Sequence, residues 1–191
     1  HTDSLNGKPV YEPTDTLKAF TKITLKGHIA DLNGNKLNDF NGTIHPTVLD
    51  KAVKITTLGN DGINTMEFYT RENIIYKGKA QVVNGNFSFS FIVPKDIIYS
   101  YGTGKISYYA HDSIRDASGH FSNFITGGTN PNFLPDDNGP EIELYINDEN
   151  FVNGGITDRN PAIFARISDE SGINTTGSGI GHDITVILDN E

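Results

Sequence analysis

The sequence contains no cysteine among its 191 residues. A disulfide scaffold, a thiolate zinc site and a cysteine nucleophile are therefore excluded within these residues. Basic side chains are also scarce, because 15 Lys and Arg stand against 24 Asp and Glu and give a formal net charge of −9. Binding to the phosphate backbone of nucleic acid depends on clustered Lys and Arg, so this charge balance argues against a nucleic-acid partner.

Long hydrophobic runs are missing as well. No apolar run approaches the roughly 18 residues that a membrane-spanning helix needs, so no transmembrane segment is predicted. The chain begins at His1, with neither an initiator Met nor a basic, apolar signal segment. We therefore expect it to be a piece of a longer protein. Collagen and disorder are excluded too, because Gly follows no three-residue period and large apolar residues recur throughout.

Turn-forming residues are abundant. The 20 Gly, 20 Asn and 8 Pro make up about a quarter of the chain, which is typical of many short strands joined by tight turns. Asn and Gly tolerate positive φ, so an Asn-Gly pair between apolar runs predicts a hairpin turn. Such pairs begin at Asn6, Asn33, Asn41, Asn84, Asn138 and Asn153. The composition therefore predicts an all-β fold.

Alternation of apolar and polar residues predicts where the strands lie. In residues 86–93 the side chains of Phe87, Phe89 and Phe91 share one face, and the stretch 74–83 precedes them across an Asn-Gly turn, which predicts a hairpin. Further strands are predicted over 21–30, 51–58, 104–110, 121–126, 141–147, 162–168 and 183–188. Residues 14–20 begin with Thr or Asp as a possible helix cap, and we expect at most one helical turn there.

The polar, turn-rich stretch 134–140 separates two parts of the chain. We predict an immunoglobulin-like β-sandwich over 1–135, which is long enough to bury its own core, and a linker over 136–140. A second immunoglobulin-like module is predicted to begin at 141 and to run to 191. It is expected to be incomplete, because three strands in this length fall short of the roughly 100 residues of a seven-stranded sandwich.

Two groups of polar residues are candidates for a calcium site. The spacing of Asp31, Asn33, Asn35 and Asp39 is similar to that of an oxygen-ligand calcium loop. The full twelve-residue match fails, because Lys36 occupies the position of the invariant Gly. The alternative is a hairpin turn that uses Asx hydrogen bonds.

The second acidic group combines linker residues with a later turn. Its members are Asp136, Asp137, Asp169 and Glu170. An interdomain calcium ion is one hypothesis for this group, and plain solvated turns are the other. We expect no cofactor in the chain, with calcium as the alternative.

No catalytic constellation is found in the sequence. His111-Asp112 and His182-Asp183 are adjacent pairs, but neighbours on a strand point to opposite faces and do not form a relay. Nucleophilic catalysis needs a base that is itself oriented, and no G-x-S-x-G elbow is present. The glycine-rich residues 177–181 lack the strand-then-helix context of a phosphate loop. We therefore predict neither a catalytic nor a cofactor-binding residue.

Two further patterns leave alternatives open. Four tyrosines form either a platform for a sugar or peptide, or ordinary packed rings whose hydroxyls bind backbone groups: Tyr99, Tyr101, Tyr108 and Tyr109. Three N-x-S/T acceptors are either glycosylation sites or chance matches in an Asn-rich chain: Asn41, Asn86 and Asn174.

Several longer strings carry a resemblance to a known family. They are GHIADLNGNKLNDFNGTIHPTVLDK (27–51), VVNGNFSFSFIVPKDIIYSYGTGKISYYA (82–110), GPEIELYINDENFVNGG (139–155) and DESGINTTGSGIGHDITVILDN (169–190). Together they resemble the region that follows the catalytic domain in gingipain-family cysteine peptidases that serve as sortases of the type IX secretion system in Bacteroidetes. The resemblance covers essentially the whole chain, and the DESGIN…GIGHDI stretch is its most specific part.

The resemblance implies a non-catalytic role. In the family, the catalytic Cys and His lie in an upstream caspase-like domain, so no catalytic residue is carried over to this sequence. The chain would be an accessory β region at the outer-membrane surface that positions or recognises partners. The implied partners are the upstream catalytic domain, the sorting domains of secreted cargo and proteins of the secretion machine. Two alternatives remain: a surface adhesin or carbohydrate-binding module, and a plain structural spacer.

Overall fold

The computed structural model of this chain describes residues 1–12, 16–60, 62, 64–134, 138–170, 172–173 and 184–187. None of these residues lies in a helix, so the predicted all-β class is confirmed. The chain divides into two units, of which one is built on His1–Phe133 and the other is Leu134–Ile173. Each unit is described by itself.

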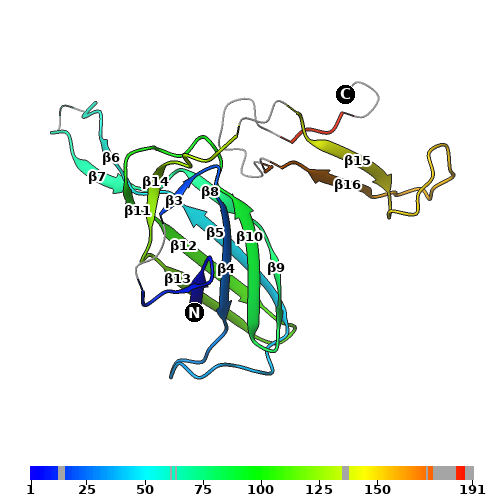
Figure 1. Cartoon of the computed structure of the whole chain (residues 1–191), viewed down its shortest axis with the longest axis horizontal. Coiled ribbons are helices and arrows are strands. Elements are labelled where there is room, and N and C mark those ends of the chain that lie inside the picture. The colour runs from blue at the N-terminus through cyan, green and yellow to red at the C-terminus, as the bar shows by residue number, and fades with distance from the viewer. Residues whose placement is uncertain are drawn as a thin grey trace. The chain divides into compact units, whose positions relative to one another are not determined.

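A nine-stranded sheet organises the first unit (Figure 1). Its strand order is β13-β12-β5-β9-β10-β4-β1-β2, and β8 also pairs with β5. Every pairing within it is antiparallel. The strands are β1 (Thr2–Leu5), β2 (Lys8–Pro9), β4 (Lys22–His28), β5 (Gly42–Leu49), β8 (Ile74–Lys77), β9 (Ala80–Val83), β10 (Asn86–Ile92), β12 (Lys105–His111) and β13 (Asp116–Phe121).

The predicted hairpin is confirmed between β9 and β10. Asn84 and Gly85 form its turn with φ values of 49° and 73°, the left-handed conformation that an Asn-Gly hairpin turn requires. The hairpin itself is short, because only Val82 and Val83 pair with β10. The main partner of β10 is β4, which pairs with it from Asn86 to Ile92.

Two smaller sheets complete the first unit. One has the order β11-β14-β3 and consists of β11 (Gly102–Thr103), β14 (Ile125–Thr129) and β3 (Leu17–Ala19). Its β14 and β3 run parallel. The other is a two-stranded arm of β6 (Val53–Thr56) and β7 (Glu67–Thr70), which extends away from the main sheet (Figure 1).

The core forms where the main sheet folds over its own inner face. On β10, Phe87, Phe89 and Phe91 point inward, in agreement with the alternation in the sequence. The ring of Phe87 lies 5.6 Å from that of Tyr108 on β12, although β5 and β9 separate these strands in the sheet. The ring of Phe91 lies 4.7 Å from that of Tyr76 on β8. Strands at a distance within one sheet thus face each other, which gives the predicted sandwich.

Three local predictions are corrected. The segment Leu17–Ala19 is a strand and not a helical turn, because Leu17 and Ala19 are both buried and pair with β14. The strand predicted over 121–126 is split, since β13 ends at Phe121 and β14 begins at Ile125. The strand predicted over 183–188 is wrong for 184–187, which lie in no strand, and its other residues lie outside the described part.

The second unit contains one antiparallel hairpin. Its strands are β15 (Glu141–Ile146) and β16 (Ile163–Ser168), which pair along their whole length. None of its described residues is buried, and apolar side chains such as Leu144 and Phe164 are exposed. The domain boundaries given above and the incomplete second module stay predictions.

Candidate functional site

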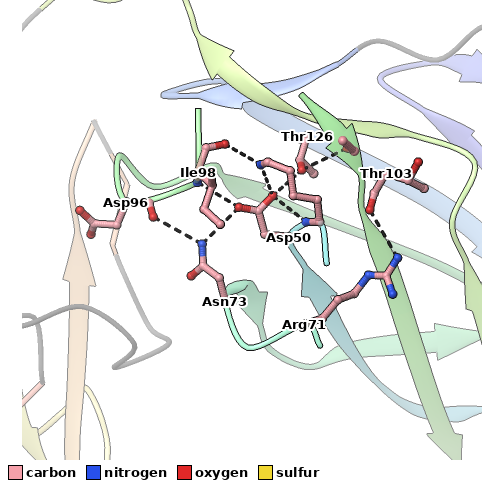
Figure 2. A network of polar contacts seen from close by, with 9 residues as sticks. Asp50, Arg71, Asn73, Asp96, Ile98, Thr103 and Thr126 are labelled. Atoms are coloured by element: carbon pink, nitrogen blue, oxygen red, sulfur yellow. Dashed lines mark hydrogen bonds and ion pairs between the residues drawn. The ribbon is translucent and has the colours of Figure 1, made fainter. Parts of the chain in front are cut away.

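A buried polar cluster lies directly after β5 and is centred on Asp50. The side chain of Asp50 is fully buried. Its Oδ1 accepts hydrogen bonds from the backbone N–H of Lys51 (2.8 Å), from Lys51 Nζ (2.9 Å) and from the hydroxyl of Thr126. Its Oδ2 accepts from the backbone N–H of Ile98 (3.0 Å) and from Asn73 Nδ2 (3.3 Å). Figure 2 shows these donors around the carboxylate.

The period of the preceding strand explains why Asp50 points inward. Along β5, Ile44, Pro46 and Val48 are buried and the residues between them are less so. Asp50 continues the same alternation by one step, so its side chain enters the interior beside the apolar ones. Sequence reasoning missed this residue, and the only signal for it is that alternation extended past the end of the strand.

Lys51 is almost as deeply buried, with 8% of its surface exposed. Its Nζ donates to Asp50 Oδ1 and also to the backbone carbonyl of Ile98 at 2.5 Å. A buried charge of this kind is tolerated only when it is paired and hydrogen-bonded, and Lys51 meets both conditions.

Hydrogen bonding also sets the charge state of Asp50. Burial raises the pKa of the carboxyl, but the hydrogen bonds from Thr126, Lys51 and Ile98 outweigh burial and hold the pKa below its ordinary value of 3.8. The carboxylate is therefore ionised at neutral pH.

This cluster, which we call the Asp50 clamp, consists of the side chains of Asp50, Lys51, Asn73 and Thr126 with the backbone of Ile98. Five donors already occupy the carboxylate, so it has little capacity left to accept a proton from a substrate. The clamp joins the end of β5 to the β7–β8 loop, the segment between β10 and β11, and β14. Its geometry fits a structural tie and not acid–base catalysis.

The first calcium candidate is an Asx turn in the structure. Asp31 Oδ1 accepts from the backbone N–H groups of Asn33 and Asn35, each at 2.8 Å, and Oδ2 accepts from Asn35 Nδ2 at 3.1 Å. The hydrogen bonds from Asn35 are the main cause that lowers the pKa of Asp31. Asp39 instead forms an ion pair with Arg115, whose Nη1 lies 3.1 Å from its Oδ2. Three of the four predicted ligands thus bond to one another within the turn, and Asp39 pairs with a residue outside it.

The second calcium candidate is described only in part. Asp136 and Asp137 lie outside the described residues, whereas Asp169 and Glu170 belong to the second unit. Among the residues that the structure describes, no group of three or more His, Cys, Asp or Glu is arranged to hold a metal ion. Both calcium hypotheses stay predictions.

The side chains of the adjacent residues His111 and Asp112 contact different partners. Nε2 of His111 lies 3.4 Å from Nε2 of His45, whereas Asp112 Oδ2 binds Arg115 Nη2 at 2.8 Å. The two side chains therefore have different partners. His182, Asp183 and the glycine-rich residues 177–181 lie outside the described part of the chain.

The four tyrosines do not form one platform. Tyr108 is buried, its hydroxyl shares a hydrogen bond of 2.8 Å with Thr2 Oγ1, and burial raises its pKa to about 12. Tyr109 points to the opposite face of β12, while Tyr99 and Tyr101 are exposed in the segment before it. At least one of the four is thus an ordinary packed ring.

Two of the predicted glycosylation acceptors are engaged within the chain. Asn41 Oδ1 accepts from the backbone N–H of Asn84 at 2.9 Å, and Asn86 Oδ1 accepts from Lys36 Nζ at 2.6 Å. Asn174 lies outside the described residues.

The β6–β7 arm exposes several large apolar side chains. Leu58 is 84% exposed, Tyr69 72% and Met66 68%. The arm itself is held by its backbone ladder and by an ion pair between Lys54 Nζ and Glu67 Oε2 at 2.7 Å. Leu58 and Met66 lie in the loop that joins the two strands, and Tyr69 lies on β7. Exposed apolar groups on a projecting element are typical of a contact surface.

Comparison with solved structures gives an informative relative. No family model matches the chain, and no curated protein matches it either. Dimeric latent PorU from Porphyromonas gingivalis, a solved structure, is 33% identical with a TM-score of 0.69, over 100% of this chain and 18% of that one. The chain thus spans about a fifth of PorU. The predicted resemblance is confirmed, because the similarity to PorU extends over the whole chain.

Proposed function

We propose that the chain is a non-catalytic accessory β region of a gingipain-like cysteine peptidase, the sortase of a type IX secretion system, and that it positions or recognises cargo. The observation that carries this proposal is the similarity to PorU, which extends over the entire chain at 33% identity with a TM-score of 0.69. Because the chain has no cysteine, the nucleophile of such a peptidase lies elsewhere in the protein.

The same resemblance supports a location at the outer-membrane surface in Bacteroidetes. The partners would be the upstream catalytic domain, the sorting domains of secreted cargo and proteins of the secretion machine. Among the described residues, no helix has the length and apolar character to cross a membrane. A net charge of −9 suits a module held in solvent better than one that lies flat on an anionic leaflet.

The β6–β7 arm supports the recognition part of the proposal. Its exposed apolar side chains, Leu58, Met66 and Tyr69, are available on an element that extends from the main sheet (Figure 1). A projecting two-stranded arm also offers unpaired backbone groups to a β-rich partner such as a cargo sorting domain.

An assay of cargo processing by the full-length protein distinguishes a role in cargo recognition from a role as a plain spacer. We expect a variant with Leu58→Ser, Met66→Ser and Tyr69→Ser to process cargo more slowly, because its contact surface is polar. Ile114→Ser is the matched control, since Ile114 is 90% exposed in a turn on another part of the unit. Normal processing by both variants would support the spacer alternative. Urea-unfolding midpoints of both variants that equal that of the unmodified 191-residue chain would show that the fold is intact.

The non-catalytic part of the proposal has its own test. The purified chain is incubated with a sorting-domain substrate, with and without a cysteine-protease inhibitor. We expect no inhibitor-sensitive cleavage, and its appearance would contradict the proposal. A glycan array addresses the adhesin alternative, which specific binding of a glycan would favour over cargo recognition.

A further inference from the structure

The outer face of the main sheet carries two histidines side by side. His45 lies on β5 and His111 on β12, and both are exposed while their neighbours Ile44 and Ala110 are buried. In the antiparallel register, His45 pairs with Tyr109, so His111 stands on the diagonal two residues along β12. Side chains at such diagonal positions are within reach of each other.

The two imidazoles approach through the same ring atom. Nε2 of His45 and Nε2 of His111 are 3.4 Å apart, and the ring planes are inclined by 16° with 5.5 Å between their centroids. This separation is long for a direct hydrogen bond, which is ordinarily about 2.7–3.2 Å between heavy atoms. The ring of Tyr109 lies 6.2 Å from that of His45 and 5.9 Å from that of His111, and limits how both can turn.

The distance between the two nitrogens matches the separation of two ligand atoms on one tetrahedral metal ion. Zinc binds imidazole nitrogen at about 2.0–2.1 Å, so two nitrogens at the tetrahedral angle around one ion lie about 3.3–3.4 Å apart. A right-angled arrangement would place the same nitrogens only about 2.9 Å apart. The observed 3.4 Å therefore fits a tetrahedral ion better than an octahedral or square-planar one.

We propose that Nε2 of His45 and Nε2 of His111 together bind one zinc ion on the outer face of β5 and β12. Among the described residues no third acidic, histidine or cysteine ligand joins them, so water fills the remaining positions. The ion would tie β5 to β12 from the solvent side. This proposal does not depend on the proposed function.

Zinc titration by calorimetry tests the proposal on the untagged 191-residue chain. Every sample carries His1→Gln, because the N-terminal amine and imidazole of His1 would chelate zinc themselves. We expect one zinc ion to bind per chain. His45→Gln or His111→Gln should weaken the zinc affinity at least about tenfold, because even the loss of a residue that only hydrogen-bonds to a metal ligand weakens metal affinity by about that factor. His120→Gln is the matched control. His120 is exposed on the neighbouring strand β13, on the same face of the sheet as His111, and its replacement should leave the zinc affinity unchanged.

Imidazole ¹H–¹⁵N spectra give a second readout. Zinc should shift the Nε2 resonances of His45 and His111 together and leave that of His120 in place, while the spectra show that each variant remains folded. The proposal is overturned if no zinc binds, if binding survives both His45→Gln and His111→Gln, or if His120→Gln weakens it equally.

Discussion

Thr126 donates a buried hydrogen bond from its hydroxyl to Oδ1 of Asp50, although 76 residues separate the two in the sequence. Thr126 belongs to β14 in the three-stranded sheet, and Asp50 follows β5 in the main sheet. Both residues are fully buried. The bond therefore links the two sheets in the interior, and the stability of the first unit should depend on it.

Removal of the Asp50 charge should destabilise the protein strongly. Asp50→Asn leaves the ammonium group of Lys51 buried without its counter-ion, and loss of one partner from a buried pair costs about 3–5 kcal/mol. Urea unfolding at pH 7 measures the loss. The matched control is Glu67→Gln, which breaks the exposed pair with Lys54 and should cost less than about 1 kcal/mol. Equal losses in the two variants would contradict a special role for the Asp50 clamp.

The hydroxyl of Thr126 can be tested by itself. Thr126→Val keeps the shape of the side chain but removes the donor to Asp50, and a hydrogen bond to a charged group contributes about 1.5–3 kcal/mol. Thr126→Ser retains the hydroxyl and should lose less. If urea unfolding shows the serine variant to be the less stable of the two, packing of the methyl group matters more than the hydrogen bond.

The stability difference between the two Thr126 variants should depend on pH. Hydrogen bonds hold the pKa of folded Asp50 below the 3.8 of an ordinary carboxyl, so the ionised clamp stabilises the fold above that pH. The stabilisation is lost as pH falls through the lower, folded pKa. The difference in unfolding free energy between Thr126→Ser and Thr126→Val should therefore be full at pH 7 and shrink as the pH is lowered below 3.8. Asp31 and Asp112 also have lowered pKa values, but their contributions cancel in this difference.

Local patterns in the sequence predicted those strands that alternate clearly. Phe87, Phe89 and Phe91 were placed on one face of β10, and the Asn-Gly pair at Asn84 was placed in the hairpin turn. Both predictions hold because side-chain alternation and positive φ are properties of a few consecutive residues.

Contacts between distant segments could not be predicted in the same way. The strand at Leu17 forms because β14 lies beside it in parallel, and nothing in residues 14–20 encodes that partner. The approach of His45 to His111 depends on the register of β5 against β12, and a shift by one residue would move either side chain to the opposite face. Asp50 follows β5, a strand that was not predicted from the sequence, so the burial of its side chain was not predicted either.

Two glycines with positive φ should respond differently to alanine. At Gly7, with φ of 80°, a Cβ atom would meet no other atom within 4 Å, so Gly7→Ala carries only the conformational cost of about 1–2 kcal/mol. At Gly85, with φ of 73°, the Cβ atom would lie 2.3 Å from the carbonyl oxygen of Leu37. We expect Gly85→Ala to destabilise the protein more than Gly7→Ala in urea unfolding. Equal costs would mean that the loop at Leu37 moves freely.

Calcium should leave the loop at Asp31 unchanged. Both carboxylate oxygens of Asp31 already accept hydrogen bonds within the turn, and Asp39 is paired with Arg115, so an ion would have to displace these donors. Calcium is titrated into metal-free protein while backbone ¹H–¹⁵N shifts of residues 31–39 are followed, with Asp31→Asn as the control. We expect no saturable shift in either protein. A saturable shift that is present in the unmodified chain and lost in Asp31→Asn would establish a calcium site there, because only a ligand role for Asp31 distinguishes the two titrations.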